Sequence, residues 1–440
     1  MQFCLGRLLL LTVAVPAIAG EFVWLSDIHF DPLADPRIVD QLAAAEPAQW
    51  AAILNSGSMK FPDFGHDTNW PLFVSLLQET ERIERKPAFT IVTGDLLGHH
   101  FRERFNTMAA VHDDEAFRSF VRKTAEFVTL QIKQSSAGAP LIIALGNNDS
   151  DCGDYALQPS GPFLVDTAKF VSDSDSYKRY GSYSLKNPAL KRQRILVLNT
   201  VFFSLKYHNV CGNAADDPGT GELAWLASEL REAESQHDKV WLVYHIPPGV
   251  DAYATTHSKQ MGAGSVTLLW KEMYQAKFLS LLSQYQGVVG PNFAGHVHVD
   301  DFRLLGSAEK TSPFVVLGPA ASPITGQNPS FRLVKFGADG RLEDQATYNL
   351  KNLIEAGRGE TPDWELEYDF RREWKLPELN AQSYAKLYER IADSSETAGR
   401  WWLLYSTSSP AASSVTPSRY RQFYCAEENL TADAYEACVK

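Results

Sequence analysis

The stretch Phe22-Val23-Trp24-Leu25-Ser26-Asp27-Ile28-His29 contains the pattern from which the fold can be predicted. Its first four residues are apolar and β-prone, which is typical of a short buried strand. Two side chains that can bind metals, Asp27 and His29, follow directly. Open α/β sheets bind ligands just beyond the carboxyl ends of their strands. The stretch therefore predicts a buried strand that leads into a metal-binding loop.

The same arrangement recurs along the chain. Further apolar runs indicate buried strands at residues 89–92, 141–145, 195–198 and 240–244, and later at 314–317, 331–336 and 346–350. Between the earlier runs, apolar residues at helical spacing predict helices, for example over 117–132 and 223–230. Strand and helix alternating in this way predict a layered α/β domain. The late runs suit the closing edge of the sheet or a second sheet.

The character of the chain changes after Gly357. Residues 364–405 are rich in Trp, Tyr, Leu, Arg and Glu at helical spacing, which predicts a helical C-terminal subdomain. Residues 406–418, dense in Ser, Thr, Pro and Ala, are expected to form a loop inside it. We therefore divide the chain into a signal peptide at 1–19, a main domain at 20–357 and the helical subdomain at 358–440.

The N-terminal residues are typical of an export signal. Arg7 precedes the apolar run 8–15, and Ala17-Ile18-Ala19 has the small-x-small pattern of a cleavage site. The run is too short to span a bilayer, and no other stretch approaches the ~20 apolar residues that a membrane helix needs. We expect a secreted or periplasmic protein.

Four cysteines would remain after cleavage: Cys152, Cys211, Cys425 and Cys438. In an oxidising compartment they are expected to form disulfides, and four cysteines permit three pairings. The short span from Cys425 to Cys438 favours a local bridge, which leaves Cys152 with Cys211. Free buried thiols are the alternative.

Composition limits the classes of partner. Of 440 residues, 45% are hydrophobic and 12% aromatic, enough for one large core. The chain has 41 basic and 53 acidic residues, a formal net charge of -12. Nothing in this charge balance would hold a polyanion, so nucleic acid is not an expected partner.

Seven side chains with metal-binding oxygens or nitrogens follow predicted strands: Asp27, His29, Asp95, Asn147, His245, His296 and His298. Carboxylate, imidazole and amide oxygen suit a borderline cation such as zinc, manganese or iron, and seven ligands are too many for one tetrahedral ion. Two ions that share a bridging carboxylate fit better. Such a pair lies ~3.5–4 Å apart, activates a water and holds the phosphate oxygens during in-line attack. We expect two divalent ions, with zinc as the first choice.

These motifs resemble, in their order, those of the calcineurin-like metallophosphoesterases: Asp-x-His, Gly-Asp, Gly-Asn-x-Asp, a His before a loop, and Gly-His-x-His. Finer features resemble the acid sphingomyelinase branch, namely residues 26–32, His99 four residues after Asp95, 245–249, 328–332 and a C-terminal helical region closed by two cysteines. The resemblance implies a sandwich of two mixed β-sheets flanked by helices, with a small helical C-terminal subdomain. It also implies one ion held by Asp27, His29, Asp95 and His298, and another held by Asp95, Asn147, His245 and His296.

One position departs from the family pattern. Where the family usually has histidine after Gly-Asn, this chain has Asn148, an amide that can hydrogen-bond phosphate but cannot deliver a proton. His99 matches a histidine of the sphingomyelinase branch, so the resemblance assigns it general-acid or phosphate-stabilising duty. His99 and Asn148 are therefore the candidate catalytic residues.

The expected function is two-metal hydrolysis of phosphodiester bonds. The resemblance suggests sphingomyelin, phosphocholine-type or nucleotide-type substrates. Lipid-cleaving members carry an N-terminal saposin-like module, whereas only residues 21–26 precede the first motif here, so we expect a soluble substrate, a monomer, and at most transient contact with a membrane surface. The alternatives are a phosphomonoesterase or nucleotidase of the same superfamily, and a non-catalytic protein that binds phospho-ligands. A basic groove would favour a nuclease, and the acidic balance argues against one.

Overall fold

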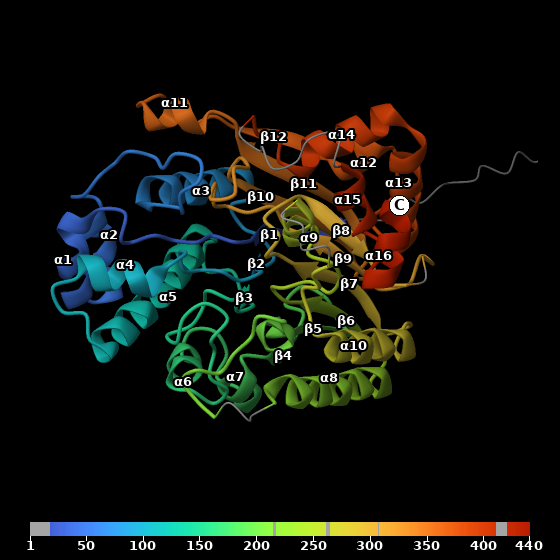
Figure 1. Ribbon diagram of the computed structural model, residues 1–440, viewed down its shortest axis with the longest axis horizontal. Coiled ribbons are helices and arrows are strands. Elements are labelled where there is room, and N and C mark those ends of the chain that lie inside the picture. The colour runs from blue at the N-terminus through green and yellow to red at the C-terminus, as the bar shows by residue number, and fades with distance from the viewer. Residues whose placement is uncertain (1–17, 214–216, 261–264, 307, 411–419) are drawn as a thin grey trace, which may run out of the picture.

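Two six-stranded sheets form the centre of the computed structural model, which describes residues 18–213, 217–260, 265–306, 308–410 and 420–440 (Figure 1). The first sheet has the order β12-β11-β10-β1-β2-β3, and its strands are β1 (Ile18–Leu25), β2 (Thr90–Val92), β3 (Leu141–Ile143), β10 (Ser330–Gly337), β11 (Leu342–Leu350) and β12 (Trp364–Asp369). The second has the order β4-β5-β6-β7-β9-β8, and its strands are β4 (Tyr183–Lys186), β5 (Gln193–Val197), β6 (Lys239–Val243), β7 (Val289–Ala294), β8 (Asp301–Leu304) and β9 (Phe314–Leu317).

Both sheets are mixed. Strands β1, β2 and β3 run parallel, while β10, β11 and β12 are antiparallel additions. In the second sheet β5, β6, β7 and β9 run parallel, and the edge strands β4 and β8 are antiparallel. The predicted fold class, two mixed sheets flanked by helices, is confirmed.

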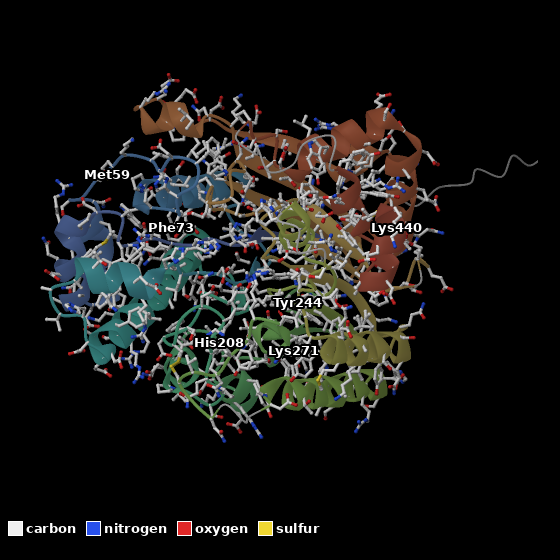
Figure 2. The ribbon with its side chains drawn as sticks, viewed as in Figure 1. Met59, Phe73, His208, Tyr244, Lys271 and Lys440 are labelled. Atoms are coloured by element: carbon white, nitrogen blue, oxygen red, sulfur yellow. A yellow bond between two sulfur atoms is a disulfide. The ribbon has the colours of Figure 1, made fainter. Side chains whose placement is uncertain are left out.

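Aromatic side chains join the two sheets. The ring of Phe22 on β1 lies 5.8 Å from Trp241 on β6 and 5.5 Å from Phe293 on β7, measured between centroids. Of the side chains labelled in Figure 2, Phe73 and Tyr244 are fully buried. Burial of such large rings stabilises the sandwich through area removed from water and through edge-to-face contacts.

Helices cover both outer faces (Figure 1). The N-terminal helices pack beside the first sheet: α1 (Val39–Ala44), α2 (Trp50–Leu54), α3 (Trp70–Ile83), α4 (Phe101–Met108) and α5 (Asp114–Ser135). Helices α8 (Pro218–Ser235) and α10 (Glu272–Gln284) lie beside the second sheet, and α6 (Pro162–Thr167), α7 (Asp175–Tyr180), α9 (Ala252–Gln260) and α11 (Leu353–Gly357) are short. Helix α5 begins where Asp113 accepts a hydrogen bond from the Ala116 amide, and its apolar face is buried, as its spacing predicted.

Most of the described part of the C-terminal segment after residue 369 is helical. Its helices are α12 (Phe370–Trp374), α13 (Ala381–Asp393), α14 (Ser395–Tyr405), α15 (Tyr420–Cys425) and α16 (Ala432–Val439). Residues 364–369, predicted to be helical, instead form β12. The open edge of β11 offers backbone groups that need partners, and pairing with them overrides the helical spacing of this short stretch. The subdomain boundary at residue 358 therefore stays a prediction.

Two further predictions fall partly outside the described residues. The predicted signal peptide lies there up to residue 17, while Ile18 and the residues after it already form β1. Of the predicted loop at 406–418, only residues 406–410 are described. None of the helices in the described part of the chain combines the length and apolar character that crossing a bilayer requires.

Two disulfides are present, Cys152–Cys211 and Cys425–Cys438. This is the pairing that the sequence favoured over its alternatives. The first bridge ties the loop after β3 to the segment before α8, and the second joins α15 to α16. Each bridge restricts the unfolded chain and so favours the folded state.

Glu222 on α8 makes stability depend on pH. Its carboxyl group is fully buried, accepts hydrogen bonds from the Ser182 hydroxyl and the Asn199 amide, and has its pKa raised by burial to about 8. The folded state therefore keeps a proton on Glu222 that the unfolded chain releases near pH 4.5. The contribution of Glu222 to the free energy of unfolding is fully present below pH 4.5 and is lost as pH rises through about 8.

We expect Glu222→Gln to reduce the loss of stability between pH 4.5 and pH 8. The change in the free energy of unfolding that the substitution causes should be more favourable at pH 8 than at pH 4.5 by about 1–3 kcal/mol. Urea unfolding across this range measures it. The matched control is Glu234→Gln, an exposed glutamate on the same helix. Equal pH dependence in both variants would contradict the prediction.

Candidate dinuclear metal centre

The predicted ligands sit in loops at one edge of the sandwich. Five parallel strands, β1, β2 and β3 of the first sheet and β6 and β7 of the second, end at this edge. The ligands follow these strands in order: Asp27 and His29 after β1, Asp95 after β2, Asn147 after β3, His245 after β6, and His296 and His298 after β7. Tertiary packing of the two sheets therefore places five separate segments side by side.

The seven side chains form two overlapping groups. The donor atoms of Asp27, His29, Asp95 and His298 lie within 4.8 Å of one another, and so do those of Asp95, His245 and His296. Asn147 joins the second group, because its Oδ1 is 3.1 Å from Nε2 of His245. Asp95 belongs to both groups. The structure thus brings all seven predicted residues together and places Asp95 where a bridging carboxylate would lie.

Ring orientation fits a bound cation. Nδ1 of His29 lies 3.1 Å from the Leu97 carbonyl, and Nδ1 of His245 lies 2.7 Å from the Thr93 carbonyl. A carbonyl oxygen can only accept, so each Nδ1 carries a hydrogen, and Nε2 is the nitrogen that can bind a metal once the ring is neutral. Those Nε2 atoms face other ring nitrogens, at 3.0 Å in His298 and 3.2 Å in His296. A divalent ion between such nitrogens could be bound by both, so this donor set fits metal ions.

The charges of the buried groups also favour cations. Burial raises the pKa of Asp95, but attraction to His245 and His29 outweighs it and holds that pKa well below its usual range. Burial, together with His99, lowers the pKa of His29 to about 4, so its ring is neutral at physiological pH. Burial also lowers the pKa of His245, but the Asp95 charge overcomes it and brings the pKa to about 9. A metal ion at His245 must therefore displace a proton.

The backbone is strained at the ligand positions. Asp27, His29, Asp95, His296 and His298 have φ values of 47°, 45°, 53°, 74° and 63°, in the left-handed region. That conformation costs a non-glycine residue roughly 1–2 kcal/mol. Such strain persists where the surrounding structure enforces it, and it clusters at functional sites. Here it turns each side chain inward from a tight loop.

Gly146 lets the loop after β3 approach Asp95. A Cβ atom at this position would lie 2.1 Å from Asp95 Oδ1 and 2.3 Å from the Asp95 backbone nitrogen, closer than real contacts allow. We expect Gly146→Ala to displace Asp95 and to lower hydrolytic activity at least about 100-fold, since misplacing a reacting group by ~1 Å costs that much. Steady-state kinetics with metal analysis test this, and the control is Gly399→Ala, at a glycine of α14 that has no positive φ and no atom within 4 Å of its added Cβ. Near-normal activity in Gly146→Ala would contradict it.

His99 lies beside the first donor group and has a carboxylate partner. Its ring stacks on that of His29 with centroids 4.1 Å apart, and its donor atoms lie within 4.8 Å of those of His29 and His298. Asp67 accepts from the His99 amide at 2.7 Å, and its Oδ1 lies 2.9 Å from the His99 Nδ1. Burial lowers the pKa of His99, but the Asp67 bond and charge raise it above its ordinary value. Asp67 was not predicted, because no local pattern relates it to Gly94-Asp95.

Asn148 points at the shared carboxylate. Its backbone nitrogen donates to Asp95 Oδ1 at 2.8 Å, and its side-chain Nδ2 donates to Asp95 Oδ2 at 2.9 Å. The structure therefore gives Asn148 a contact that orients Asp95, while a direct contact with phosphate stays a prediction.

Two further carboxylates orient the loops. Asp154 accepts from Nδ2 of Asn147 at 2.7 Å, which leaves the Asn147 carbonyl oxygen directed at His245. Asp149 accepts from the amides of Leu96 and Gly146, both at 2.8 Å, and thereby joins the loops after β2 and β3. Ligands held in this way keep their geometry when the ion is absent. Sequence analysis missed Asp154, although its place in the loop after Asn147 is a weak signal.

The chain was compared with known proteins. It is 27% identical to human acid sphingomyelinase-like phosphodiesterase 3b over 446 residues, covering 96% of this chain and 90% of that protein. It is 26% identical to mouse cyclic GMP-AMP phosphodiesterase SMPDL3A, covering 97% of this chain and 92% of the other. Bovine sphingomyelin phosphodiesterase is 30% identical over 269 residues, which are 59% of this chain and 39% of that enzyme. No family model matches the chain.

The phosphodiesterases to which the chain is similar and the two overlapping donor groups support a metal-dependent phosphoesterase. Within that class, the chain is similar over nearly its whole length to the acid sphingomyelinase-like phosphodiesterases. The resemblance that the motifs indicated is thereby confirmed.

Proposed function

We propose that this protein hydrolyses phosphodiester bonds at two divalent metal ions held by the seven residues of the two donor groups. The observation that carries the proposal is the position of Asp95, whose carboxylate is the one group common to both sets of donors in the described part of the chain. When bound, the two ions would supply an activated water and would stabilise the charge on the phosphate oxygens.

The protein side chains have separate duties in this scheme. Asp95 is held by its two bonds from Asn148, so both of its oxygens keep a fixed direction. His99, with Nδ1 engaged by Asp67, can hold a second proton on Nε2 and pass it to the oxygen of the leaving group. A charged carboxylate behind the ring favours the protonated imidazole that this step needs. His99 would then protonate the leaving group in place of the family histidine, at whose position this chain has Asn148.

His99→Ala is expected to act according to the leaving group. With glycerophosphocholine, whose glycerol oxygen must be protonated as it leaves, activity should fall about 10²–10⁴-fold. With bis(p-nitrophenyl) phosphate, whose leaving group is stable as an anion, the loss should be less than about tenfold.

Kinetics with both substrates measure the two losses of activity. The matched control is the exposed neighbour His100, replaced by asparagine because His100 has a φ of 51°. Equal losses on both substrates would remove His99 from the protonation step.

Lys206 favours a nucleotide-type substrate. Its ammonium lies 5.2 Å from the centre of the Tyr155 ring, and the Tyr155 hydroxyl lies 3.4 Å from Nε2 of His296. The Lys206 side chain is exposed and can meet a second negative charge on a substrate whose scissile phosphate is at the metals. This supports the soluble substrate that we expected, and among soluble substrates it favours a nucleotide-type diester.

A lipid diester is the second candidate. Leu205 and Val210 flank Lys206 in the same loop and are 50% and 64% exposed. Exposed apolar side chains in this loop could contact a membrane surface transiently while a lipid phosphate binds. The two candidates therefore make opposite predictions about which side chains of this loop matter.

A substrate panel tests the proposal. Purified protein would be assayed with bis(p-nitrophenyl) phosphate, p-nitrophenyl phosphate, cyclic GMP-AMP and sphingomyelin micelles, before and after chelation and metal return. We expect chelation to abolish diester cleavage, metal to restore it, and Lys206→Ala to weaken cyclic GMP-AMP cleavage most. Preference for p-nitrophenyl phosphate would favour a monoesterase, and no turnover of any substrate would favour a binding protein.

We further propose zinc as the resident metal, export from the cytoplasm, and a monomeric state. Mixed imidazole and carboxylate donors support zinc, with manganese or iron as alternatives. The two disulfides support an oxidising compartment, either periplasmic or extracellular. Metal analysis of the purified protein, N-terminal sequencing of the exported protein for cleavage after Ala19, and light scattering test the three points.

A further inference from the structure

A cavity of about 300 Å³ lies at the edge of the sandwich opposite the metal loops. It is lined by the amino ends of β6, β7 and β9, whereas the metal loops follow the carboxyl ends of β6 and β7. Its wall is largely apolar and includes Trp241, Val289, Phe314, Leu342 and Leu379, all of them buried within the fold. A space of this size falls at the lower end of the range for small-molecule sites.

Two polar groups of the wall bond within the wall, whereas the buried Nε2 of Gln193, in the same lining, has no hydrogen-bond partner in the described structure. The indole nitrogen of Trp241 donates to the Gly340 carbonyl at 3.1 Å, and the Leu379 amide donates to the Leu342 carbonyl at 3.2 Å. These bonds tie the β10–β11 turn and the segment before α13 around the cavity. What the wall offers to a guest is therefore mainly hydrocarbon and aromatic surface, which favours an apolar guest over water.

Charged side chains surround the mouth, with an excess of positive charge. Arg341 pairs with Asp339, and Lys310 pairs with Glu378. The ammonium of Lys239 instead donates to the Gly287 carbonyl at 2.5 Å. The lining thus contains three cationic residues and two carboxylates, although the whole chain has a net charge of -12. Such a mouth complements one negative charge at the end of an apolar guest.

From this combination we propose that the cavity is a binding site for a single-chain amphiphile with an anionic head, of the medium-chain fatty-acid class. The chain lies against Trp241, Leu342 and Leu379, and the carboxylate stays at the mouth beside Lys239. The binding is non-covalent and separate from the metal centre, so it does not depend on the proposed hydrolysis.

Calorimetric titration of the full chain with decanoate tests the site. A chelator is present to remove metal ions, so that decanoate cannot bind at the metal centre. Gly290→Leu fills the cavity, because a Cβ atom at Gly290 meets only the Val240 carbonyl, at 3.8 Å. We expect saturable binding by the parent protein, at least about tenfold weaker binding by Gly290→Leu, and about threefold to fivefold weaker binding by Lys239→Ala. Lys277→Ala, an exposed lysine on α10, should bind as the parent does.

The head group gives a second test. Decyltrimethylammonium has the same chain with a cationic head and should bind at least about fivefold more weakly than decanoate. If Gly290→Leu does not fold, as checked by thermal unfolding, Val288→Trp at the half-buried Val288 of the lining replaces it. The proposal is overturned by absence of saturable decanoate binding, by parent-like affinity in the filled variant, or by equal affinity for the cationic amphiphile.

Discussion

His245→Ala is expected to lower metal-dependent diester hydrolysis at least about 10³-fold, which corresponds to about 4 kcal/mol of transition-state stabilisation. His245 is fully buried, and its Nε2 lies 3.2 Å from Asp95 Oδ2 and 3.1 Å from Asn147 Oδ1. Removing the ring takes one ligand from the second donor group and leaves Asp95 without its nearest cationic neighbour in that group.

The measurement combines kinetics on bis(p-nitrophenyl) phosphate with the metal content of the purified variant. Metal content should fall from two ions per chain toward one, because the first donor group of Asp27, His29, Asp95 and His298 is left intact. His112→Ala, at an exposed histidine between α4 and α5, is the matched control and should keep full activity. Unchanged activity in His245→Ala would reject the two-metal proposal itself.

Arg332→Met is expected to lower the free energy of unfolding by about 3–5 kcal/mol, because it leaves a buried carboxylate without its cation. The Arg332 guanidinium is fully buried, forms an ion pair with Asp300, and donates from Nη1 to the Leu317 carbonyl at 2.8 Å. Asp300 also accepts from the hydroxyls of Thr347 and Tyr368, both at 2.9 Å. This network joins both sheets to the loop that carries His298.

Urea unfolding of the metal-free protein measures the loss. The matched control is Arg372→Met, which removes a surface ion pair with Asp369 and should change stability little. The double variant Arg332→Met with Asp300→Asn should recover part of the loss, since it removes the unpaired charge. A loss in Arg332→Met no larger than that in the surface control would show that the ion pair is not needed for stability.

The Arg332 network gives a structural reason for one of the finer sequence features. Residues 328–332 were singled out by resemblance alone, without a role. In the structure, Asn328 donates to the Thr407 carbonyl at 3.0 Å, and Arg332 pairs with Asp300 two residues after His298. The motif therefore attaches the C-terminal helices to the metal loop. That role depends on contacts between segments far apart in sequence, which no local pattern contains.

Sequence alone was sufficient for the features that repeat locally. Apolar runs located eight of the strands within a few residues, because a buried strand must exclude polar side chains over its whole length. Three of the four edge strands, β4, β8 and β12, were not predicted, because polar and charged residues interrupt their apolar side chains. Strand β7, which begins Val289-Gly290-Pro291, was also missed because its glycine and proline interrupt the β pattern.

The sequence by itself determined the chemical types of the seven donor residues, their order along the chain and the favoured disulfide pairing, because each depends on residue identity and short spacing. Only the tertiary structure decided that Asp67 stands behind His99, that Asn148 turns to Asp95, and that Gly146 must be small. Those facts depend on how two sheets bring the ends of five strands to one edge. Distances across that edge are set by packing, which a linear pattern does not encode.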